Sequence, residues 1–563
     1  MRKIWISFFI FLLWPLSAQA VSPQPVLAKL GMVVSEQQLA SQVGVDILQA
    51  GGNAIDAAVA VGYALAVVNP CCGNIGGGGF MTIHLANGKD IFLNFREKAP
   101  LAAKADMFLD AKGQVIQNKS LLGYLAVGVP GTVLGLDTAL QKYGSMTRQQ
   151  VMAPAIRLAA QGYSLTPYEV KLLNTSLQDF RKQPNVAAIF LKNNQPFQAG
   201  NTLVQTNLAD TLKLIAQKGP DVFYKGSIAE TIVKASQARG GILSMKDFAQ
   251  YTVEELAPIR CNYRGYTIIS SPPPSSGGVT LCEAANIIEA YPLNYLGYHS
   301  AQSVHYMVEA LRYAFADRNN QLGDPNFVHN PVEQLISKKY AKKIQQKIEH
   351  FHAKPSNKIN ADAFPAESTN TTHYSVVDKK GNAVAVTYTL NGFFGAKVIA
   401  GNTGFFLNDE MDDFAAKPGT ANQFGLVQSD ANGIQPGKRP LSSMTPTVIM
   451  KDNHLFMVLG SPGGPRIITA TLQTLINVID HHMNIQEAVD APRFHHQWQP
   501  DKIDIEPFTF SPDTIKNLEL MGYHVMPLDK TWGAVEAILI DPNEGVLYGG
   551  SDNRRPAGKA VGY

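Results

Sequence analysis

An alanine-rich apolar segment, Ala54–Val68, restricts the architecture of this chain more than any other feature. Gly51-Gly52-Asn53 stands before it and ends an earlier predicted helix that starts near Ser35 and Gln38, and Pro70 ends the segment itself. A helix that is apolar nearly all round is normally buried on every side. The sequence therefore predicts a layered fold in which helices pack against sheets.

Two strands and a turn are predicted directly after this helix. Residues 80–85 and 91–97 follow the glycine run 76–79, and Asn87-Gly88 lies between them. Asn-Gly between two apolar runs is a strong hairpin signal. This hairpin places Arg96 near the end of a strand.

The composition excludes some classes of partner. The chain has 563 residues, of which 45% are hydrophobic and 17% charged, so it can bury a large core, and length alone would suggest several domains. The formal net charge is only +3, without a dense Lys/Arg run. Proteins that bind nucleic acid usually concentrate positive charge, so nucleic acid is not expected as a partner.

The N-terminus has the three-part pattern of a secretory signal. Met1-Arg2-Lys3 precedes an apolar run from Ile4 to Leu13, and the small residues Ser17-Ala18-Gln19-Ala20 follow. The run is shorter than the roughly 20 apolar residues that span a bilayer, and no cysteine follows for a lipid anchor. We expect a signal peptide over residues 1–20 and an exported protein, periplasmic or secreted, with no membrane anchor.

The cysteines and histidines give no pattern of a metal site. Cys71, Cys72, Cys261 and Cys282 lack paired C-x-x-C spacing, and the pairs His481-His482 and His495-His496 have no completing ligands. No metal and no cofactor is therefore expected. A Cys261 to Cys282 bridge is compatible with an oxidising compartment, whereas buried free thiols are the simpler interpretation, and the pairing stays open.

A second predicted hairpin carries two threonines on one face. A polar stretch, residues 350–370, predicts an exposed, mobile segment. Beyond it, residues 371–377 and 383–390 alternate between polar and apolar side chains around a turn at 378–382. If Val377 pairs with Ala383, then Thr371 lies opposite Thr389, with Cβ atoms roughly 5 Å apart.

The position of Thr371 has a possible chemical meaning. A threonine hydroxyl is a poor nucleophile without an adjacent base, and the α-amino group of an N-terminal threonine, with a pKa of about 7.7 to 8.0, is one such base. An internal threonine lacks that amine, so this chemistry requires a cut between Asn370 and Thr371. Periodicity alone favours an ordinary loop-to-strand junction over a nucleophile at this position.

Motifs along nearly the whole chain resemble those of the γ-glutamyltranspeptidases. The processing site of that family resembles Thr371-Thr372-His373-Tyr374-Ser375 followed by Gly381-Asn382-Ala383-Val384-Ala385. Further motifs that match in order are Gly51-Gly52-Asn53-Ala54-Ile55-Asp56-Ala57-Ala58, residues 76–80, Phe95-Arg96-Glu97, residues 272–278, Pro440-Leu441-Ser442-Ser443-Met444, Ser461-Pro462-Gly463-Gly464 and Gly562-Tyr563. One glycine-rich run would be weak evidence, but agreement of so many spaced motifs is not expected by chance.

The resemblance implies an α+β fold, a four-layer αββα sandwich of the N-terminal nucleophile hydrolase type. It implies a precursor that cuts itself into a large subunit, residues 21–370, and a small catalytic subunit, residues 371–563. Thr371 would form a γ-glutamyl ester from glutathione or other γ-glutamyl compounds and pass it to water or to an amino acid or peptide acceptor.

The resemblance also assigns roles to site residues. Thr389 would hydrogen-bond near the nucleophile, and Gly463-Gly464, between a predicted strand at 454–459 and helix at 467–480, would supply oxyanion donors. A phosphate loop is disfavoured at this turn because the usual Lys-Ser/Thr is absent. For the donor, the matched residues are Arg96 for its α-carboxylate, Asp413 for its α-ammonium, Asn391 and Glu410 at the α-amino end, and Ser442 and Ser443 near the carboxylate.

Two positions depart from the family pattern. Glu410 stands where several bacterial relatives have glutamine, which adds negative charge near the ammonium. Phe424 stands at a lid position where a bacterial relative has tyrosine, so the loop over residues 418–438 either closes by packing alone or is more mobile.

Two other functions remain as alternatives. Relatives with the same fold include acylases that remove glutaryl side chains from β-lactams, but a glutaryl group lacks the α-ammonium that Asp413 and Glu410 would bind. An exported binding protein that keeps the fold without self-cleavage is the non-enzymatic alternative, and an uncut, inactive chain would be its sign.

Overall fold

The computed structural model describes residues 22–359, 371–542 and 544–563. The predicted signal peptide, most of the predicted exposed segment and the Asn370 side of the predicted cut lie outside these ranges. Within the described ranges, no helix has the length and apolar content needed to cross a membrane.

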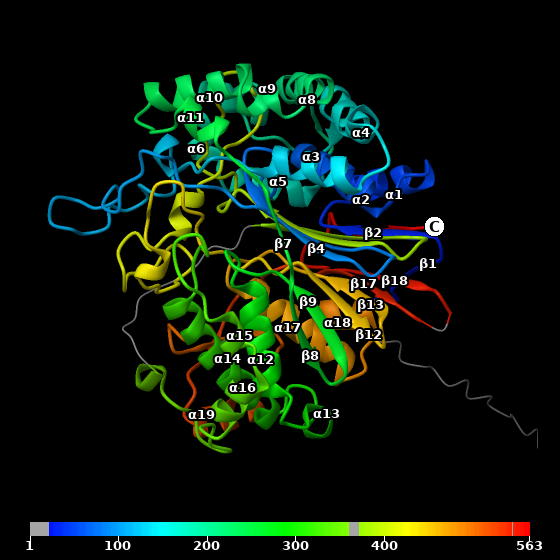
Figure 1. Ribbon diagram of the computed structural model, residues 1–563, viewed down its shortest axis with the longest axis vertical. Helices are drawn as coiled ribbons and strands as arrows, with labels where there is room; N and C mark the ends of the chain where they lie inside the picture. Colours follow the sequence, from blue (N-terminus) through cyan, green and yellow to red (C-terminus); the bar gives the residue numbers. More distant parts are fainter. Residues whose placement is uncertain (1–21, 360–370, 543) are drawn as a thin grey trace, which may run out of the picture.

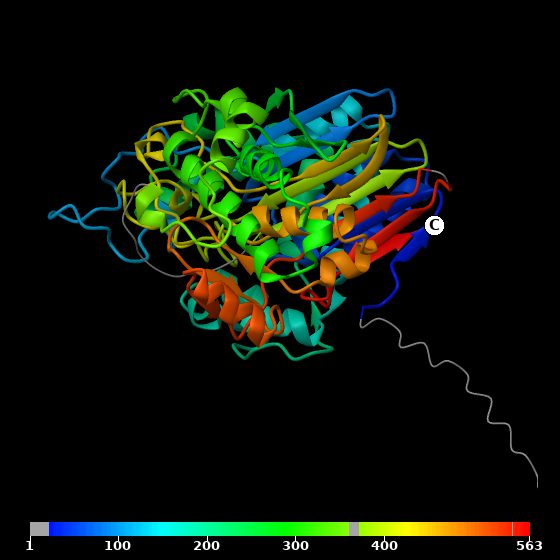
Figure 2. The same ribbon diagram turned by 90° about the horizontal axis from the view of Figure 1, so that it is seen from below.

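Two seven-stranded antiparallel sheets form the centre of the molecule (Figure 1). The strands of the first sheet, in spatial order, are β19 (Lys559–Gly562), β2 (Gly31–Ser35), β10 (Thr372–Asp378), β11 (Ala383–Thr389), β3 (Gly78–His84), β4 (Asp90–Phe95) and β7 (Glu254–Leu256). Those of the second are β1 (Val26–Ala28), β18 (Leu547–Ser551), β17 (Glu536–Ile540), β13 (His454–Leu459), β12 (Thr447–Lys451), β9 (Tyr266–Ser270) and β8 (Ile259–Tyr263). Seen from below, the strands of the two sheets run in similar directions (Figure 2), as in aligned sheet packing.

Helices cover both outer faces of the stacked sheets (Figure 1). The layer over the first sheet contains α1 (Gln38–Gln49), α2 (Ala54–Val68), α3 (Thr132–Tyr143), α4 (Arg148–Gln161), α5 (Pro167–Asn174), α6 (Leu177–Arg181), α7 (Pro184–Phe190), α8 (Thr206–Lys218), α9 (Asp221–Tyr224), α10 (Ser227–Ala238) and α11 (Met245–Ala249). The layer over the second contains α12 (Gly277–Ile288), α13 (Leu293–Leu296), α14 (Ala301–Gln321), α15 (Val332–Leu335), α16 (Lys338–Gln345), α17 (Arg466–Ile479), α18 (Ile485–Asp490) and α19 (Pro512–Leu520). The predicted four-layer αββα sandwich is confirmed.

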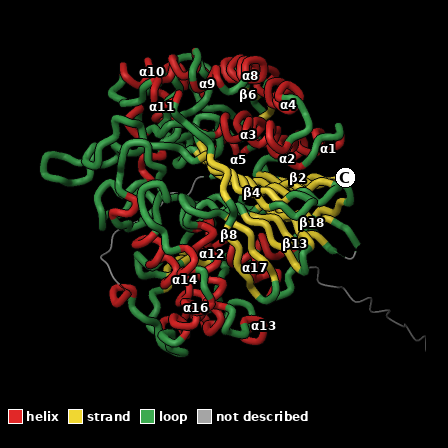
Figure 3. Tube along the Cα trace, in the orientation of Figure 1, coloured by secondary structure: helices red, strands yellow, loops and turns green. Residues whose placement is uncertain are grey.

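Smaller elements complete the fold. The strands β14 (Phe494–His495), β15 (Ile503–Ile505) and β16 (Val525–Pro527) make a three-stranded sheet, and β5 (Tyr163–Ser164) pairs with β6 (Thr202–Leu203). The short 3-10 helices are η1 (Tyr124–Ala126), η2 (Ser356–Ile359), η3 (Glu410–Asp413) and η4 (Asp430–Asn432). Loops gather at the end of the sheets that lies away from the C-terminus (Figure 3).

Helix α2 has the boundaries that the sequence predicts. Asn53 caps it by accepting from the backbone N–H groups of Ile55 and Asp56, while the Asp56 carboxylate accepts from the N–H of Asn53. Every residue of α2 is buried. Its apolar side chains are removed from water because helices α1, α3 and α4 lie around it and strands β10 and β11 lie beneath it.

The predicted hairpin of β10 and β11 forms in the predicted register. Val377 pairs with Ala383 and His373 with Thr387. The apolar face points to the helices, where the Tyr374 hydroxyl donates to the carbonyl of Ala58 at 2.9 Å. The polar face points to the second sheet, and the Ser375 hydroxyl donates to the carbonyl of Glu536 on β17 at 2.9 Å. This face is therefore buried between the two sheets.

All four cysteines form disulfides, so the interpretation as free thiols is wrong. Cys261 on β8 bonds to Cys282 on α12, and the adjacent Cys71 and Cys72 bond to each other after α2. The first bridge was one of the pairings left open by the sequence. The second escaped prediction because two adjacent cysteines pair only where the backbone turns sharply, which spacing does not reveal.

The described part of the predicted exposed segment is only partly exposed. Phe351 keeps 66% of its surface in solvent. Ser356 is buried, its N–H donates to the Asp501 carboxylate at 2.8 Å, and its carbonyl accepts from the Trp498 indole at 3.2 Å. The chain is therefore anchored at Ser356, ahead of the region that the structure leaves undescribed.

Candidate active site

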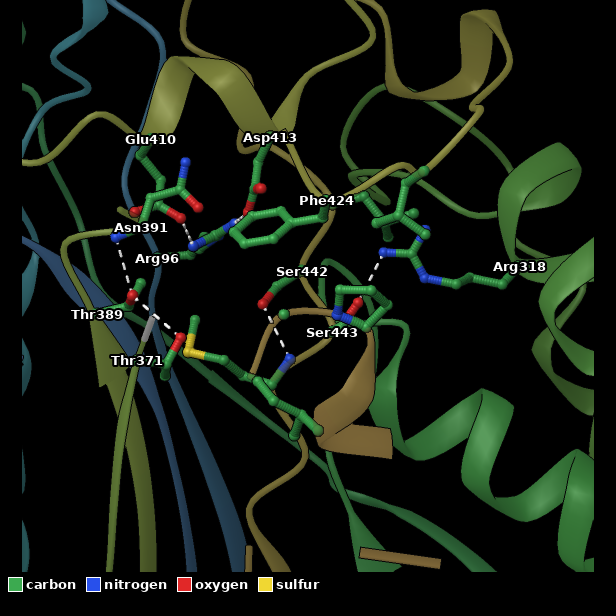
Figure 4. Close-up of a pocket in the computed structure, with 16 residues that line it drawn as sticks. Arg96, Arg318, Thr371, Thr389, Asn391, Glu410, Asp413, Phe424, Ser442 and Ser443 are labelled. Carbon is green, nitrogen blue, oxygen red and sulfur yellow. Dashed lines mark hydrogen bonds and ion pairs between the residues drawn. The ribbon is translucent and has the colours of Figure 1, made fainter. Parts of the chain in front are cut away.

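The two threonines predicted to face each other do so in the structure. Thr371 directly precedes β10, is only 4% exposed, and lies with its Oγ1 3.2 Å from the Oγ1 of Thr389 at the end of β11. The backbone N–H of Asn391 donates to the Thr389 hydroxyl oxygen at 2.8 Å (Figure 4). This second contact fixes the Thr389 side chain against Thr371.

The loop after β11 is held in an unusual conformation. Asn391 has a φ of 73°, a left-handed value that asparagine tolerates better than most residues. Its side-chain amide donates to the carbonyl of Asp409 at 3.0 Å. On the other side, the carbonyl of Cys72 accepts from the N–H of Leu390 at 3.0 Å. The loop is thus fixed between the Cys71–Cys72 turn and the segment that carries Glu410 and Asp413.

A buried arginine with three carboxylates forms one wall of the pocket. Arg96 follows β4, and its guanidinium donates to Glu410, to Asp413 and, at 3.5 Å, to Glu97. Its Nε also donates to the carbonyl of Pro440 at 3.3 Å. Figure 4 shows Glu410, Asp413 and Arg96 side by side above the two threonines.

Burial controls the charges in this wall. It raises the pKa of Glu97 to about 7, and it raises the pKa of Glu410 well above its ordinary value although Arg96 opposes both shifts. Burial alone would lower the pKa of Arg96, but Glu410, Asp413 and Glu97 together hold it above its ordinary value. The arginine therefore stays charged, and burial favours the protonated forms of Glu97 and Glu410.

Two adjacent serines form the opposite wall. The Ser442 hydroxyl oxygen accepts from the N–H of Met444 at 3.1 Å, and that of Ser443 accepts from Arg318 at 2.9 Å. The segment is fixed to the start of α12, because the Ser276 hydroxyl donates to the Ser442 carbonyl at 2.6 Å. Both serines line the same pocket as Thr371.

Sequence reasoning missed Arg318 in this pocket. Arg318 lies on α14, about one helical turn after Ala314 and Phe315 and about two turns after Leu311. These three residues are buried, so Arg318 lies on the apolar face of the helix. An arginine on the apolar face of a helix could have indicated a functional residue in the sequence, because charged side chains are almost never fully buried without a partner.

The predicted glycine turn lies between β13 and α17, beside the threonines. Gly463 and Gly464 have φ values of 134° and 55°, which favour glycine. Among the described residues, neither N–H has a hydrogen-bond acceptor. Gly464 lines the pocket, whereas Gly463 lies one residue outside its lining.

The loop at residues 418–438 covers the pocket by packing. Phe424 is buried, and its ring packs so closely against Gly464 that an added Cβ at that glycine would lie only 2.8 Å from the ring. The Phe424 carbonyl accepts from the Gln497 side chain at 3.2 Å. This placement agrees with closure by packing, and the mobility of the loop stays a prediction.

All predicted site residues except Gly463 line one pocket. Its lining consists of Arg96, Arg318, Thr371, Thr389, Asn391, Glu410, Asp413, Phe424, Leu426, Leu441, Ser442, Ser443, Met444, Gly464, Pro465 and Ile467. The pocket brings together a hydroxyl pair, a set of acids with an arginine, two serines and a glycine turn. No group of three or more potential metal ligands occurs within the described ranges.

The chain is similar to known proteins over nearly its whole length. A family model described as gamma-glutamyltranspeptidase matches residues 40–562. The glutathione hydrolase proenzyme of Pseudomonas sp. (strain A14) is 56% identical over 556 residues, which cover 97% of this chain and 96% of that protein. The glutathione hydrolase proenzyme of Escherichia coli (strain K12) is 50% identical over 541 residues, covering 96% of this chain and 93% of that protein.

A solved structure confirms the fold class. The cephalosporin acylase from Bacillus halodurans matches with a TM-score of 0.85 and 29% identity, covering 98% of this chain and 99% of that chain. The residues matched by the family model include every residue of the pocket.

Proposed function

The chain belongs to the gamma-glutamyltranspeptidase family, and from this premise we propose how its pocket acts as a self-processing γ-glutamyltransferase and glutathione hydrolase. The observation that carries the proposal is the pair of hydroxyls of Thr371 and Thr389, 3.2 Å apart, beneath the acids around Arg96.

The precursor is cut between Asn370 and Thr371, giving a large subunit from residue 21 to 370 and a small one from 371 to 563. The Thr371 hydroxyl attacks the Asn370 carbonyl, and the C–N bond between the two residues breaks, which frees the α-amino group and leaves an ester. Hydrolysis of that ester releases the Asn370 carboxylate and returns the Thr371 hydroxyl. The two subunits stay together as a heterodimer, since β10 and β11 of the small subunit lie between β2 and β3 of the large one. Backbone ladders on both sides of this hairpin therefore join the two subunits.

In the transfer reaction, the Thr371 oxygen bonds to the γ-carbonyl carbon of glutathione while its proton passes to the new α-amino group. The γ-amide C–N bond then breaks, and the leaving amine of cysteinylglycine takes that proton. Water or the amino group of an amino acid or peptide attacks the γ-glutamyl ester and releases Thr371. The N–H groups of Gly463 and Gly464 stabilise the oxyanion formed in each addition.

The donor is held by its two α-groups. Arg96, Ser442 and Ser443 bind the α-carboxylate, and Asp413, Glu410 and Asn391 bind the α-ammonium. The Glu410 carboxyl group offers the donor ammonium a hydrogen-bond acceptor. The protein carries a signal peptide over residues 1–20 and acts after export, in the periplasm or outside the cell.

The glycine turn provides one prediction. Gly464→Ala should lower kcat/KM by at least about tenfold, because the new Cβ would come within 2.8 Å of Phe424 at a φ of 55° and displace the oxyanion donors. Gly265→Ala is the matched control, since Gly265 has a φ of 84° with nothing within 4 Å of its Cβ. Equal kcat/KM values in both variants would contradict the proposed role of Gly464 as an oxyanion donor.

The donor class is tested by competition. The purified protein is given glutathione and, separately, a glutaryl-substituted β-lactam, the kind of donor that a cephalosporin acylase structure suggests. We expect kcat/KM to favour glutathione by at least about a hundredfold, because a glutaryl donor leaves Glu410 and Asp413 without their ammonium. A preference for the glutaryl donor would support the acylase function.

A further inference from the structure

Arg318 is a buried cation in the pocket with no carboxylate beside it. It is 1% exposed, and its guanidinium donates to the Ser276 hydroxyl at 2.9 Å, the Asn319 side chain at 2.7 Å and the Ser443 hydroxyl at 2.9 Å. All three acceptors are neutral. Over the described residues, no carboxylate oxygen lies within ion-pair distance of Arg318.

Other buried arginines of this chain have acidic partners. Arg312, on the same helix, lies 3.1 Å from Glu309 and 3.2 Å from Asp501. Arg466 lies 2.9 Å from Asp504. A buried charge without a counter-ion is costly, so Arg318 indicates an anion that arrives with a ligand. Burial lowers the pKa of Arg318 to about 10, and Arg96 adds to this shift, although the more distant carboxylate of Asp413 opposes it.

Arg96, by contrast, already forms ion pairs with carboxylates of the protein. Its guanidinium contacts Glu410, Asp413 and Glu97, so the α-carboxylate of a donor meets a cation surrounded by acids. Four of the five N–H groups of Arg96 donate to Glu410, Asp413, Glu97 and the Pro440 carbonyl, which leaves one N–H of Nη2 for that carboxylate. A second cation on the side of the serines would balance the charge.

Both serines line the pocket, and each hydroxyl still has a proton that it can donate. The Ser443 oxygen accepts from Arg318, and the Ser442 oxygen accepts from the N–H of Met444, so each hydroxyl proton is left to donate. Figure 4 shows Ser443 between Arg318 and the centre of the pocket. Two hydroxyl donors, one of them held by a guanidinium, form a receptor for a carboxylate.

We propose that Arg318 is a specificity-determining residue that acts through Ser443: it holds the Ser443 hydroxyl as a donor and supplies the uncompensated positive charge that selects donors with an α-carboxylate. This inference rests on the proposed function and adds to it the residue that balances the charge of the carboxylate. Arg318 does not itself touch the reacting atoms.

The test compares two donors that differ only at the α-carboxyl group. One is a γ-glutamyl anilide, and the other is the same compound with its α-carboxylate replaced by a neutral carboxamide. Arg318→Gln should reduce the preference for the acid donor by at least about tenfold, mainly through a higher KM for that donor, with kcat for the amide donor little changed. Arg318→Lys, which keeps the charge, should lose less of the preference.

Arg312→Gln is the matched control. It removes a buried arginine from the same helix but not from the pocket, so it should leave the acid-to-amide preference at the wild-type value. If Arg318→Gln does not fold, Ser443→Ala decides the question, since it keeps Arg318 and removes the hydroxyl through which Arg318 acts. That variant should lose the preference to a similar extent.

The outcomes separate the two proposals. A wild-type protein that releases no aniline from the γ-glutamyl donor would contradict the proposed function. An active wild type, together with an Arg318→Gln or Ser443→Ala variant that keeps the wild-type preference, would overturn the role of Arg318 alone. A general structural role of Arg318 would lower the activity on both donors equally, which also overturns it.

Discussion

Thr371→Ala is expected to yield one uncut chain that has lost γ-glutamyl transfer by about four orders of magnitude or more. The same hydroxyl performs both reactions, and alanine removes it from a position only 3.2 Å from its partner on Thr389. Denaturing electrophoresis measures the cut, and release of cysteinylglycine from glutathione measures the activity. Both should be lost together.

Thr371→Ser and Thr372→Ser are the controls for this prediction. The first keeps a hydroxyl at the cut and should still be processed. The second changes the neighbouring side chain, whose hydroxyl accepts from Asn69 at 3.4 Å, without touching the nucleophile. A Thr371→Ala protein that is cut normally would contradict the proposed role of this hydroxyl in processing.

Arg96→Lys is expected to raise the KM for glutathione by about a hundredfold with a smaller effect on kcat. Lysine keeps the charge but cannot make the forked hydrogen bonds by which the guanidinium would hold the donor α-carboxylate, and it cannot hold both Glu410 and Asp413 in place. Steady-state kinetics over a range of glutathione concentrations measure the change.

Arg439→Lys is the matched control for Arg96. Arg439 is also buried and lies 2.8 Å from Glu254, but it does not line the pocket. Its replacement should leave the KM for glutathione close to the wild-type value. An unchanged KM in Arg96→Lys would assign Arg96 a structural role only.

The parts of the fold that the sequence predicted well are those with strong local rules. The hairpin of β10 and β11 has one polar and one apolar face, so a slip of one residue would bury the wrong side chains, and the register follows from the pattern. Helix α2 begins at Asn53 because its side chain caps the helix, and this signal is local as well.

Other parts depend on contacts between distant segments. Arg318, Ser276 and Ser443 meet because α14, α12 and the segment before β12 pack together, and no spacing in the sequence predicts that meeting. The pairing of Arg96 with Glu410 likewise needed the fold, although both had been assigned to the site. Resemblance to the family supplied Arg96, Glu410 and Ser443 but not Arg318, and local pattern alone would have left all of them as ordinary polar positions.

The most direct test of the central claim is intact-mass analysis with N-terminal sequencing of the purified protein. Two chains are expected, one of which begins Thr371-Thr372-His373 with a free α-amino group. A single chain that contains Thr371 at an internal position, in a protein active on glutathione, would contradict Thr371 as an N-terminal nucleophile.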